Sequence, residues 1–145
     1  MTDKDYMQEA INLARLGAGF TAPNPMVGAV VVKDGVIVGK GYHHKFGQAH
    51  AEVEALAMAG SQAQGATLYV TLEPCAHYGK TPPCANRVVE AGIKRVVIGS
   101  VDPNPLVAGK GIAILKAGGI QVDRSSLEDL CIDLNRDFFT FIQTK

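Results

Sequence analysis

Three residues of types that bind zinc occupy positions where the predicted elements could bring them together. His50 opens HAEVEALAMA, a run of high helix propensity. Cys75 directly follows ATLYVTL, a strand-like run, and Cys84 begins the next predicted helix. In open α/β sheets, sites form outside the carboxyl ends of the strands. Three protein ligands, rather than four, are typical of catalytic zinc, whose fourth position holds water. The sequence therefore predicts a catalytic zinc site made by His50, Cys75 and Cys84.

Glu52 is the predicted proton carrier of this site. It follows His50 by two residues in the same helical turn, a spacing that makes it a poor ligand but lets it reach a metal-bound water. Zinc lowers the pKa of bound water from about 16 to about 7, and a carboxylate beside that water can act as general base and later as general acid.

Taken singly, each of these residues has a more ordinary interpretation. A lone histidine at a helix start is usually a cap or a surface residue, and a lone cysteine is usually a small core residue. Together, H-A-E at a helix start, P-C after the next strand and P-P-C match the signature of the zinc nucleobase deaminases. Cys131, four residues after Leu127 on the last predicted helix, is interpreted instead as a buried structural thiol.

The loop between the two cysteines is longer than in the commoner form of that signature. Eight residues, AHYGKTPP, stand where two are usual, with a glycine that allows a bend and two prolines that stiffen the return. His77 and Lys80 on this loop offer hydrogen bonds and positive charge suited to a substrate phosphate or a polar base edge. The alternative is a solvated surface loop, and for Thr81 the two interpretations stay open.

Composition restricts the class of protein. The chain has 145 residues, which suits one domain, and its 14 basic and 14 acidic residues give a formal net charge of zero. Zero net charge argues against nucleic-acid binding. The polar N-terminus is unlike a signal peptide, and no apolar run approaches the roughly 20 residues of a membrane helix. Three cysteines without an export signal indicate reduced thiols, so we expect a cytoplasmic protein with no membrane partner.

Periodicity and turn residues predict ten elements in the order helix, strand, strand, helix, strand, helix, strand, helix, strand, helix. The expected segments are a helix over about Lys4–Leu16, a hairpin VGAVVV and VIVG around Asp34-Gly35, HAEVEALAMA, ATLYVTL, ANRVVEAG ending at Gly92, KRVVIGSV, GIAILKAG, GIQVD, and a last helix SSLEDLCIDLNRDFFTFI capped by Ser125 or Ser126. This order predicts an α/β fold, a three-layer α/β/α sandwich with a mixed five-stranded sheet and helices on both faces.

Four segments carry a resemblance to a known family: PCAHYGKTPPCA, APNPMVGAVVV, GYHHKFGQAHAEVEAL and DPNPLVAGKG. From about residue 5 to residue 139, the chain closely resembles the deaminase domain of the bifunctional riboflavin biosynthesis family RibD. The resemblance implies a cytidine deaminase-like fold. It also implies zinc-dependent hydrolytic deamination of 2,5-diamino-6-ribosylamino-4(3H)-pyrimidinone 5′-phosphate to 5-amino-6-ribosylamino-2,4-pyrimidinedione 5′-phosphate. The substrate would then be a small pyrimidine ribotide phosphate.

The resemblance also assigns residues. His50, Cys75 and Cys84 fall on the family's zinc ligands, and Glu52 falls on its proton shuttle. The positions where the family is expected to hold its substrate are Asn24, His43, His77 and Lys80. From the residues alone, Asn24 between two prolines is nearly as well explained as a turn residue. For Asp102 and Asn104 in DPNP, turn formation is the better interpretation.

Family members usually continue into a C-terminal reductase domain that uses NADPH, and this sequence ends where that domain would begin. We therefore expect a single zinc-dependent deaminase domain over residues 1–145, without reductase activity. A homo-oligomer is expected because this fold commonly assembles and completes its pockets across subunits.

Three other functions compete with this interpretation. One is a deaminase of another free base, nucleoside or nucleotide, although a free base has no phosphate for the basic loop to hold. A deaminase that edits nucleic acid would need a basic, aromatic groove, which zero net charge and the absence of tryptophan disfavour. A structural zinc module would take a fourth ligand, His43 or His77, and would leave Glu52 unexplained.

Overall fold

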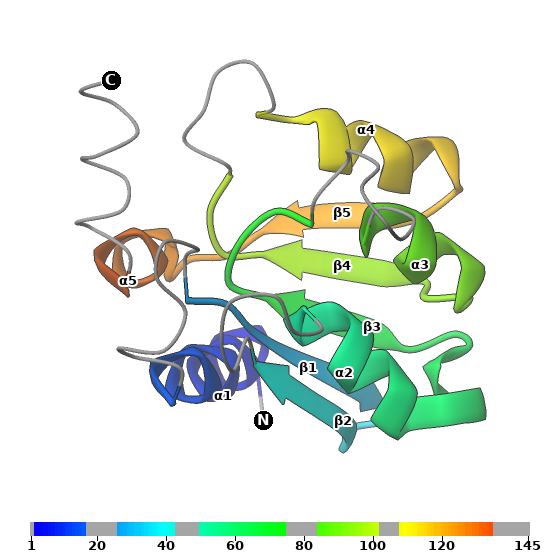
Figure 1. The fold of residues 1–145 in the computed structure, drawn as a ribbon, viewed down its shortest axis with the longest axis horizontal. Coiled ribbons are helices and arrows are strands. Elements are labelled where there is room, and N and C mark those ends of the chain that lie inside the picture. The colour runs from blue at the N-terminus through cyan, green and yellow to red at the C-terminus, as the bar shows by residue number, and fades with distance from the viewer. Residues whose placement is uncertain (1, 17–25, 43–49, 75–83, 102–107, 135–145) are drawn as a thin grey trace.

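A computed structural model describes residues 2–16, 26–42, 50–74, 84–101 and 108–134, which build a five-stranded sheet between two layers of helices (Figure 1). The elements are α1 (Asp3–Arg15), β1 (Gly28–Lys33), β2 (Val36–Tyr42), α2 (Ala51–Ala59), a short 3-10 helix (Gly60–Ala63), β3 (Thr67–Val70), α3 (Cys84–Glu90), β4 (Arg95–Ile98), α4 (Lys110–Ala117), β5 (Gln121–Arg124) and α5 (Glu128–Leu134). The predicted order of helices and strands is confirmed, except that the predicted last helix beyond Leu134 lies outside the described residues.

The sheet is mixed, as predicted. Its strand order is β2-β1-β3-β4-β5, in which β1 runs antiparallel to both neighbours while β3, β4 and β5 are parallel. Asp34 and Gly35 join β1 to β2 with φ angles of 50° and 78°, so both turn residues have the positive φ of a type I′ hairpin. The predicted hairpin is therefore confirmed, and its turn residues explain the tight reversal.

Helices cover both faces of the sheet, and the strands alternate between the two cores (Figure 1). On one face Val31, Leu68 and Val96 pack with residues of α2, α3 and α4. On the other face Tyr69 and Val97 pack with residues of α1 and α5. Both faces of each central strand are buried, as expected in a three-layer sandwich.

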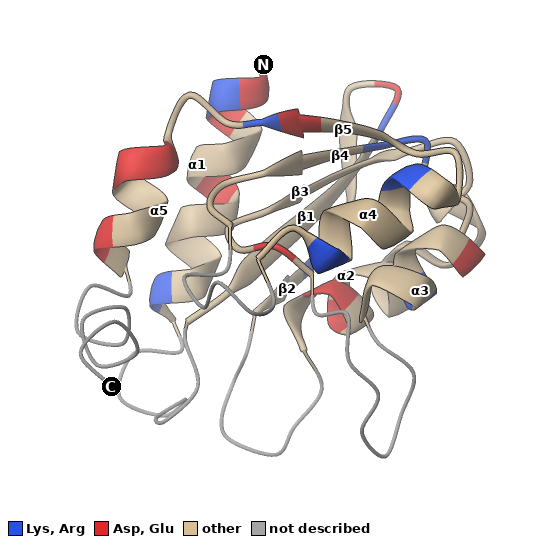
Figure 2. Cartoon of the chain, turned by 90° about the horizontal axis from the view of Figure 1, so that it is seen from above, with Lys and Arg blue, Asp and Glu red and all other residues tan. Residues whose placement is uncertain are grey.

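The topology gathers several chain segments at one edge of the sheet. Because β1 is antiparallel to both β2 and β3, β2 and β3 run in the same direction and both end where β1 begins. We call this the carboxyl edge; Gly28, Tyr42, Val70 and Ile98 lie on it, at ends of β1, β2, β3 and β4. The strands β2, β3 and β4, which end there, precede α2, α3 and α4 in the chain (Figure 2). Within the described residues, no helix is long and apolar enough to cross a membrane.

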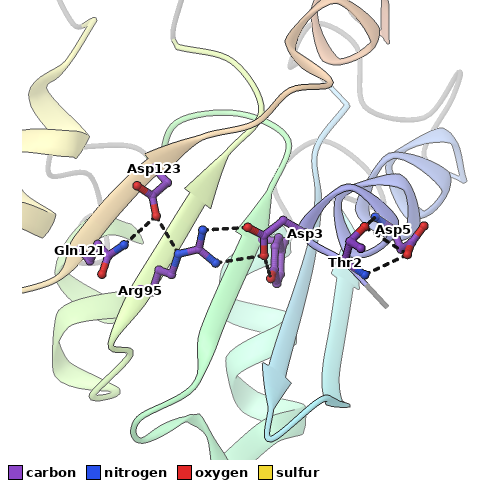
Figure 3. Close-up of polar contacts among 7 residues, drawn as sticks. Thr2, Asp3, Asp5, Arg95, Gln121 and Asp123 are labelled. Atoms are coloured by element: carbon purple, nitrogen blue, oxygen red, sulfur yellow. Dashed lines mark hydrogen bonds and ion pairs between the residues drawn. The ribbon is translucent and has the colours of Figure 1, made fainter.

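At the opposite end of β4, Arg95 joins the N-terminal helix to the far strands (Figure 3). Its Nη2 lies 2.8 Å from Oδ2 of Asp3, and its Nε lies 2.7 Å from Oδ2 of Asp123. The Tyr69 hydroxyl also donates to Asp3 at 2.5 Å. The hydrogen bonds from Arg95 and Tyr69 lower the pKa of Asp3 from 3.8 to about 2.

Replacing Asp3 with Asn should reduce the acid sensitivity of folding. Because the pKa of Asp3 is lowered in the folded chain, its ionised form stabilises the fold above about pH 4, and this contribution is lost as the pH falls through about 2. At pH 7 the variant should lose about 1 kcal/mol or less, since both partners are partly exposed. Urea denaturation at pH 7 and at pH 2 measures the difference.

Asp34→Asn is the matched control, because this exposed turn residue has positive φ, which asparagine tolerates. It should change stability little at either pH. A gap between wild type and Asp3→Asn that is as wide at pH 2 as at pH 7 would show that the charge of Asp3 is not the source of its contribution.

Candidate metal centre

Two of the three predicted zinc ligands meet at the carboxyl edge. His50 precedes α2 with extended backbone angles (φ −72°, ψ 160°), and Cys84 is the first residue of α3. Nδ1 of His50 lies 3.0 Å from Sγ of Cys84, although 34 positions separate them. The His50 side chain does not cap its helix, which removes one of the two ordinary explanations for a histidine at a helix start. Cys84 is 3% exposed whereas His50 is exposed, so this pair lies between the core and solvent.

The geometry of this pair fits zinc. Ligands at about 2.05 Å (nitrogen) and about 2.3 Å (sulfur) around one tetrahedral zinc ion lie about 3.5 Å apart. The observed 3.0 Å separation needs to open by only about half an ångström to reach that value. Imidazole and thiolate are also donors that zinc prefers. His50 and Cys84 can therefore share one zinc ion without a rearrangement of either helix.

Close packing of α2 on β2 sets the position of His50. A Cβ atom added at Gly39 would lie 2.1 Å from the carbonyl oxygen of Ala55, and one added at Gly41 would lie 2.3 Å from that of Ala51. Both alanines are fully buried. The backbone of α2 thus lies directly on β2. This contact fixes how far from the sheet His50, the residue before α2, is placed.

The two glutamates of HAEVE occupy different surroundings. Glu52 lies in the first turn of α2 and is only 4% exposed. Oε1 of Glu54 accepts a hydrogen bond from the backbone N–H of Tyr42 at 3.1 Å, which ties the end of β2 to the helix. Glu54 therefore has a structural role, and the more deeply buried of the two glutamates is Glu52, two residues after His50.

Several predicted site residues lie outside the described residues. These are the predicted ligand Cys75, the candidate substrate residues Asn24, His43, His77 and Lys80, and Thr81, Asp102 and Asn104. Accordingly, the parts of the chain that are described contain no group of three His, Cys, Asp or Glu side chains that could hold a metal. Tyr42, which directly precedes His43, and Gly28, four residues after Asn24, lie on the carboxyl edge.

Cys131 is buried, as predicted for a structural thiol. It is 1% exposed and packs on the face of the sheet covered by α1 and α5, away from His50. Burial is the main cause that raises its pKa to about 12, with a smaller contribution from the charge of Glu128. Such a thiol stays protonated at neutral pH and is inert.

Sequence reasoning missed Glu73, two residues before Cys75. Glu73 is 6% exposed, and its carboxylate oxygens accept hydrogen bonds from backbone N–H groups at the start of α4. The signal was an acidic residue at the end of a buried strand, directly before Pro74. A carboxylate in that position needs partners, but the sequence does not say which.

The fold and the His50–Cys84 pair are those of a zinc-binding deaminase domain. Residues 1–100 match the family model described as the cytidine and deoxycytidylate deaminase zinc-binding region. Zinc is the metal of that family.

Similar proteins narrow the class further. The riboflavin biosynthesis protein RibD of Aquifex aeolicus is 58% identical over 140 residues, 97% of this chain and 39% of the relative. A diaminohydroxyphosphoribosylamino-pyrimidine deaminase of Buchnera aphidicola subsp. Acyrthosiphon pisum is 52% identical over 144 residues, 99% of this chain and 98% of the relative. The solved structure of Acinetobacter baumannii RibD has a TM-score of 0.95 at 58% identity, covering 98% of this chain and 40% of that one.

The chain belongs to the diaminohydroxyphosphoribosylaminopyrimidine deaminase family of riboflavin biosynthesis. It spans about two fifths of the length of several RibD relatives and almost the whole length of the Buchnera deaminase. The predicted resemblance and the cytidine deaminase-like fold are confirmed.

Replacing Cys84 with Ser should abolish zinc binding. A serine hydroxyl stays protonated at neutral pH and is a poor zinc ligand. Elemental analysis of purified protein should give one zinc per wild-type chain and almost none in the variant. Cys131→Ala is the control, because Cys131 lies on the other face of the sheet, and it should keep its zinc. Full zinc occupancy in Cys84→Ser would remove Cys84 from the ligand set.

Proposed function

We propose that this chain catalyses the zinc-dependent hydrolytic deamination of 2,5-diamino-6-ribosylamino-4(3H)-pyrimidinone 5′-phosphate in riboflavin biosynthesis. The observation that carries the proposal is the 3.0 Å approach of His50 to Cys84, with Glu52 buried in the first turn of the helix that His50 precedes. Similarity to a deaminase of nearly equal length supports the substrate assignment.

Zinc held by His50, Cys75 and Cys84 would supply the Lewis acidity that makes water a nucleophile at neutral pH. Glu52 removes a proton from the attacking water and delivers it to a ring nitrogen, so that the amine-bearing carbon becomes more electrophilic. A carbon–oxygen bond forms at that carbon. Glu52 then takes the remaining proton from the added hydroxyl and gives it to the amine. The carbon–nitrogen bond breaks, ammonia leaves, and the added oxygen forms a carbonyl with the carbon. Glu52 is buried in the first turn of α2, two residues after the predicted ligand His50, which suits it to these steps.

Glu52→Gln should keep the zinc and the fold but lose nearly all turnover. Glutamine has the same shape but cannot carry the proton, and general acid–base catalysis contributes roughly 10²–10⁴ in rate. The rate of ammonia release from the pyrimidine phosphate measures the loss, alongside zinc content and circular dichroism.

Glu54→Gln on the same helix is the matched control, since an amide oxygen can still accept the hydrogen bond from the Tyr42 N–H. It should retain most of its activity. If Glu52→Gln kept a tenth of the wild-type rate, the proton carrier would be another residue.

Lys80, which lies outside the described residues, is proposed to bind the substrate phosphate. A hydrogen bond to a charged group contributes about 1.5–3 kcal/mol, so Lys80→Ala should raise KM for the 5′-phosphate roughly ten- to a hundredfold. Because the phosphate is remote from the reacting carbon, kcat should change less. Activity on the dephosphorylated substrate should barely change.

Lys116→Ala is the control for loss of a positive charge, because Lys116 is exposed in the last turn of α4, away from the carboxyl edge. It should leave both KM values unchanged. If Lys80→Ala impaired the phosphorylated and dephosphorylated substrates equally, Lys80 would hold the loop or the base rather than the phosphate.

The competing function, deamination of another free base, nucleoside or nucleotide, is tested by mass spectrometry of candidate substrates after incubation. The proposal requires an amine replaced by oxygen in the pyrimidine phosphate at the highest kcat/KM. We propose no nucleic-acid substrate: Figure 2 shows that the positions of basic and acidic residues are interspersed along the described elements, without the single basic stripe that such a substrate favours.

Other expectations stay predictions. These are a homo-oligomer, which sedimentation would test, a cytoplasmic location, and the lack of reductase activity in a single domain over residues 1–145. The described residues test none of them.

A further inference from the structure

The segment that leads to Cys75 is held firmly in the sheet beyond the end of β3. The backbone N–H of Thr71 donates to the carbonyl of Gly28 at 3.1 Å, and the N–H of Gly28 donates to the Thr71 hydroxyl at 3.1 Å. On the other side, the N–H of Ser100 donates to the Thr71 carbonyl at 3.0 Å, and the N–H of Glu73 donates to the Ser100 carbonyl at 2.8 Å. Strand pairing thus continues up to Glu73.

The carboxylate of Glu73 joins this strand end to α4. Its Oε1 accepts from the N–H of Gly109 at 3.0 Å, and its Oε2 accepts from the N–H of Ile112 at 3.1 Å. Both oxygens are therefore used by backbone donors at the start of the helix, which otherwise lack intrahelical partners. A buried carboxylate with two such donors is a well-defined contact, since an unpaired one would be costly.

The start of α4 also lies directly against the next residue, Pro74. A Cβ added at Gly111 would lie 2.0 Å from the Pro74 carbonyl oxygen, so only glycine allows this approach. Pro74 is buried and is bonded to Cys75. The segment Thr71–Pro74, which directly precedes the predicted ligand Cys75, is thus held by three elements. These are β1, the extension of β4, and α4.

We infer that Glu73 is a positioning residue for the metal centre: its contact with the start of α4 holds the Glu73–Pro74 segment so that Cys75 reaches the same zinc as His50 and Cys84. The inference rests on the proposed zinc site. It gives α4, which supplies no predicted ligand, a part in zinc binding. Groups that orient a ligand from outside the coordination shell typically change metal affinity by 10–100-fold when replaced.

A purely structural role is the competing explanation. A carboxylate at the start of a helix stabilises that helix through its free N–H groups and its dipole. Loss of such a cap would lower the stability of the zinc-free and the zinc-bound protein by the same amount. Loss of a positioning contact would lower zinc affinity as well, so zinc affinity separates the two roles.

Glu73→Gln in the full chain is the sharpest test. Glutamine keeps the size of the side chain but offers one acceptor oxygen, and its NH₂ group would face a backbone N–H. The dissociation constant for zinc, measured by competition with a chromogenic chelator, should rise at least tenfold while the far-ultraviolet circular dichroism stays that of the wild type. Glu90→Gln, an exposed glutamate on α3, is the control for loss of one charge and should bind zinc as the wild type does.

Each outcome decides one question. If the wild type binds zinc and Glu73→Gln binds it equally well but melts at a lower temperature without zinc, Glu73 is only a helix cap and the inference fails. If the wild type itself binds no zinc, the proposed function fails instead. Should Glu73→Gln not fold, Glu73→Asp keeps the charge but shortens the reach, and it should still weaken zinc binding; unchanged affinity in that variant overturns the inference.

Discussion

The direct contact between the backbone of α2 and the strand β2 sets the geometry on which the site depends. Gly39 and Gly41 have no side chains to hold the helix away, and the backbone of the helix at Ala51 and Ala55 lies directly against them. A single methyl group at Gly41 would overlap a backbone carbonyl, which cannot yield as a flexible side chain can. The distance between His50 and Cys84 is only about half an ångström shorter than two ligands of one zinc ion require. A methyl group at Gly41 would move the helix, and His50 with it, by more than that.

The chemistry is assembled at one edge because the hairpin reverses the direction of β1. That reversal makes β2 and β3 run the same way, so that α2 and α3 both begin on the carboxyl edge with His50 and Cys84 at their first turns. The ion pairs of Arg95 lie at the opposite end of the parallel strands and join α1 to β5 there. The charges of these ion pairs are thereby kept apart from the carboxyl edge.

Local patterns in the sequence were sufficient for the described elements, and they predicted the pair of His50 and Cys84 that the structure brings together. The Asp34-Gly35 pair predicts its hairpin because both positions need positive φ, and H-A-E at a helix start predicts His50 and Glu52 as site residues. Long-range contacts were not predictable. The partners of Glu73 are donors 36 and 39 residues later in the chain, and nothing near Glu73 specifies them. Likewise, only tertiary structure shows that Glu54 holds the end of β2.

The central claim is that His50 and Cys84 bind one zinc ion together with Cys75 and leave one position for water. X-ray absorption at the zinc edge of the purified wild-type chain tests it most directly. The account predicts two sulfur ligands at about 2.3 Å and two lighter ligands, one of them imidazole, at about 2.0–2.1 Å. A zinc ion with fewer than two sulfur ligands, or with two imidazoles that close the fourth position, would contradict it.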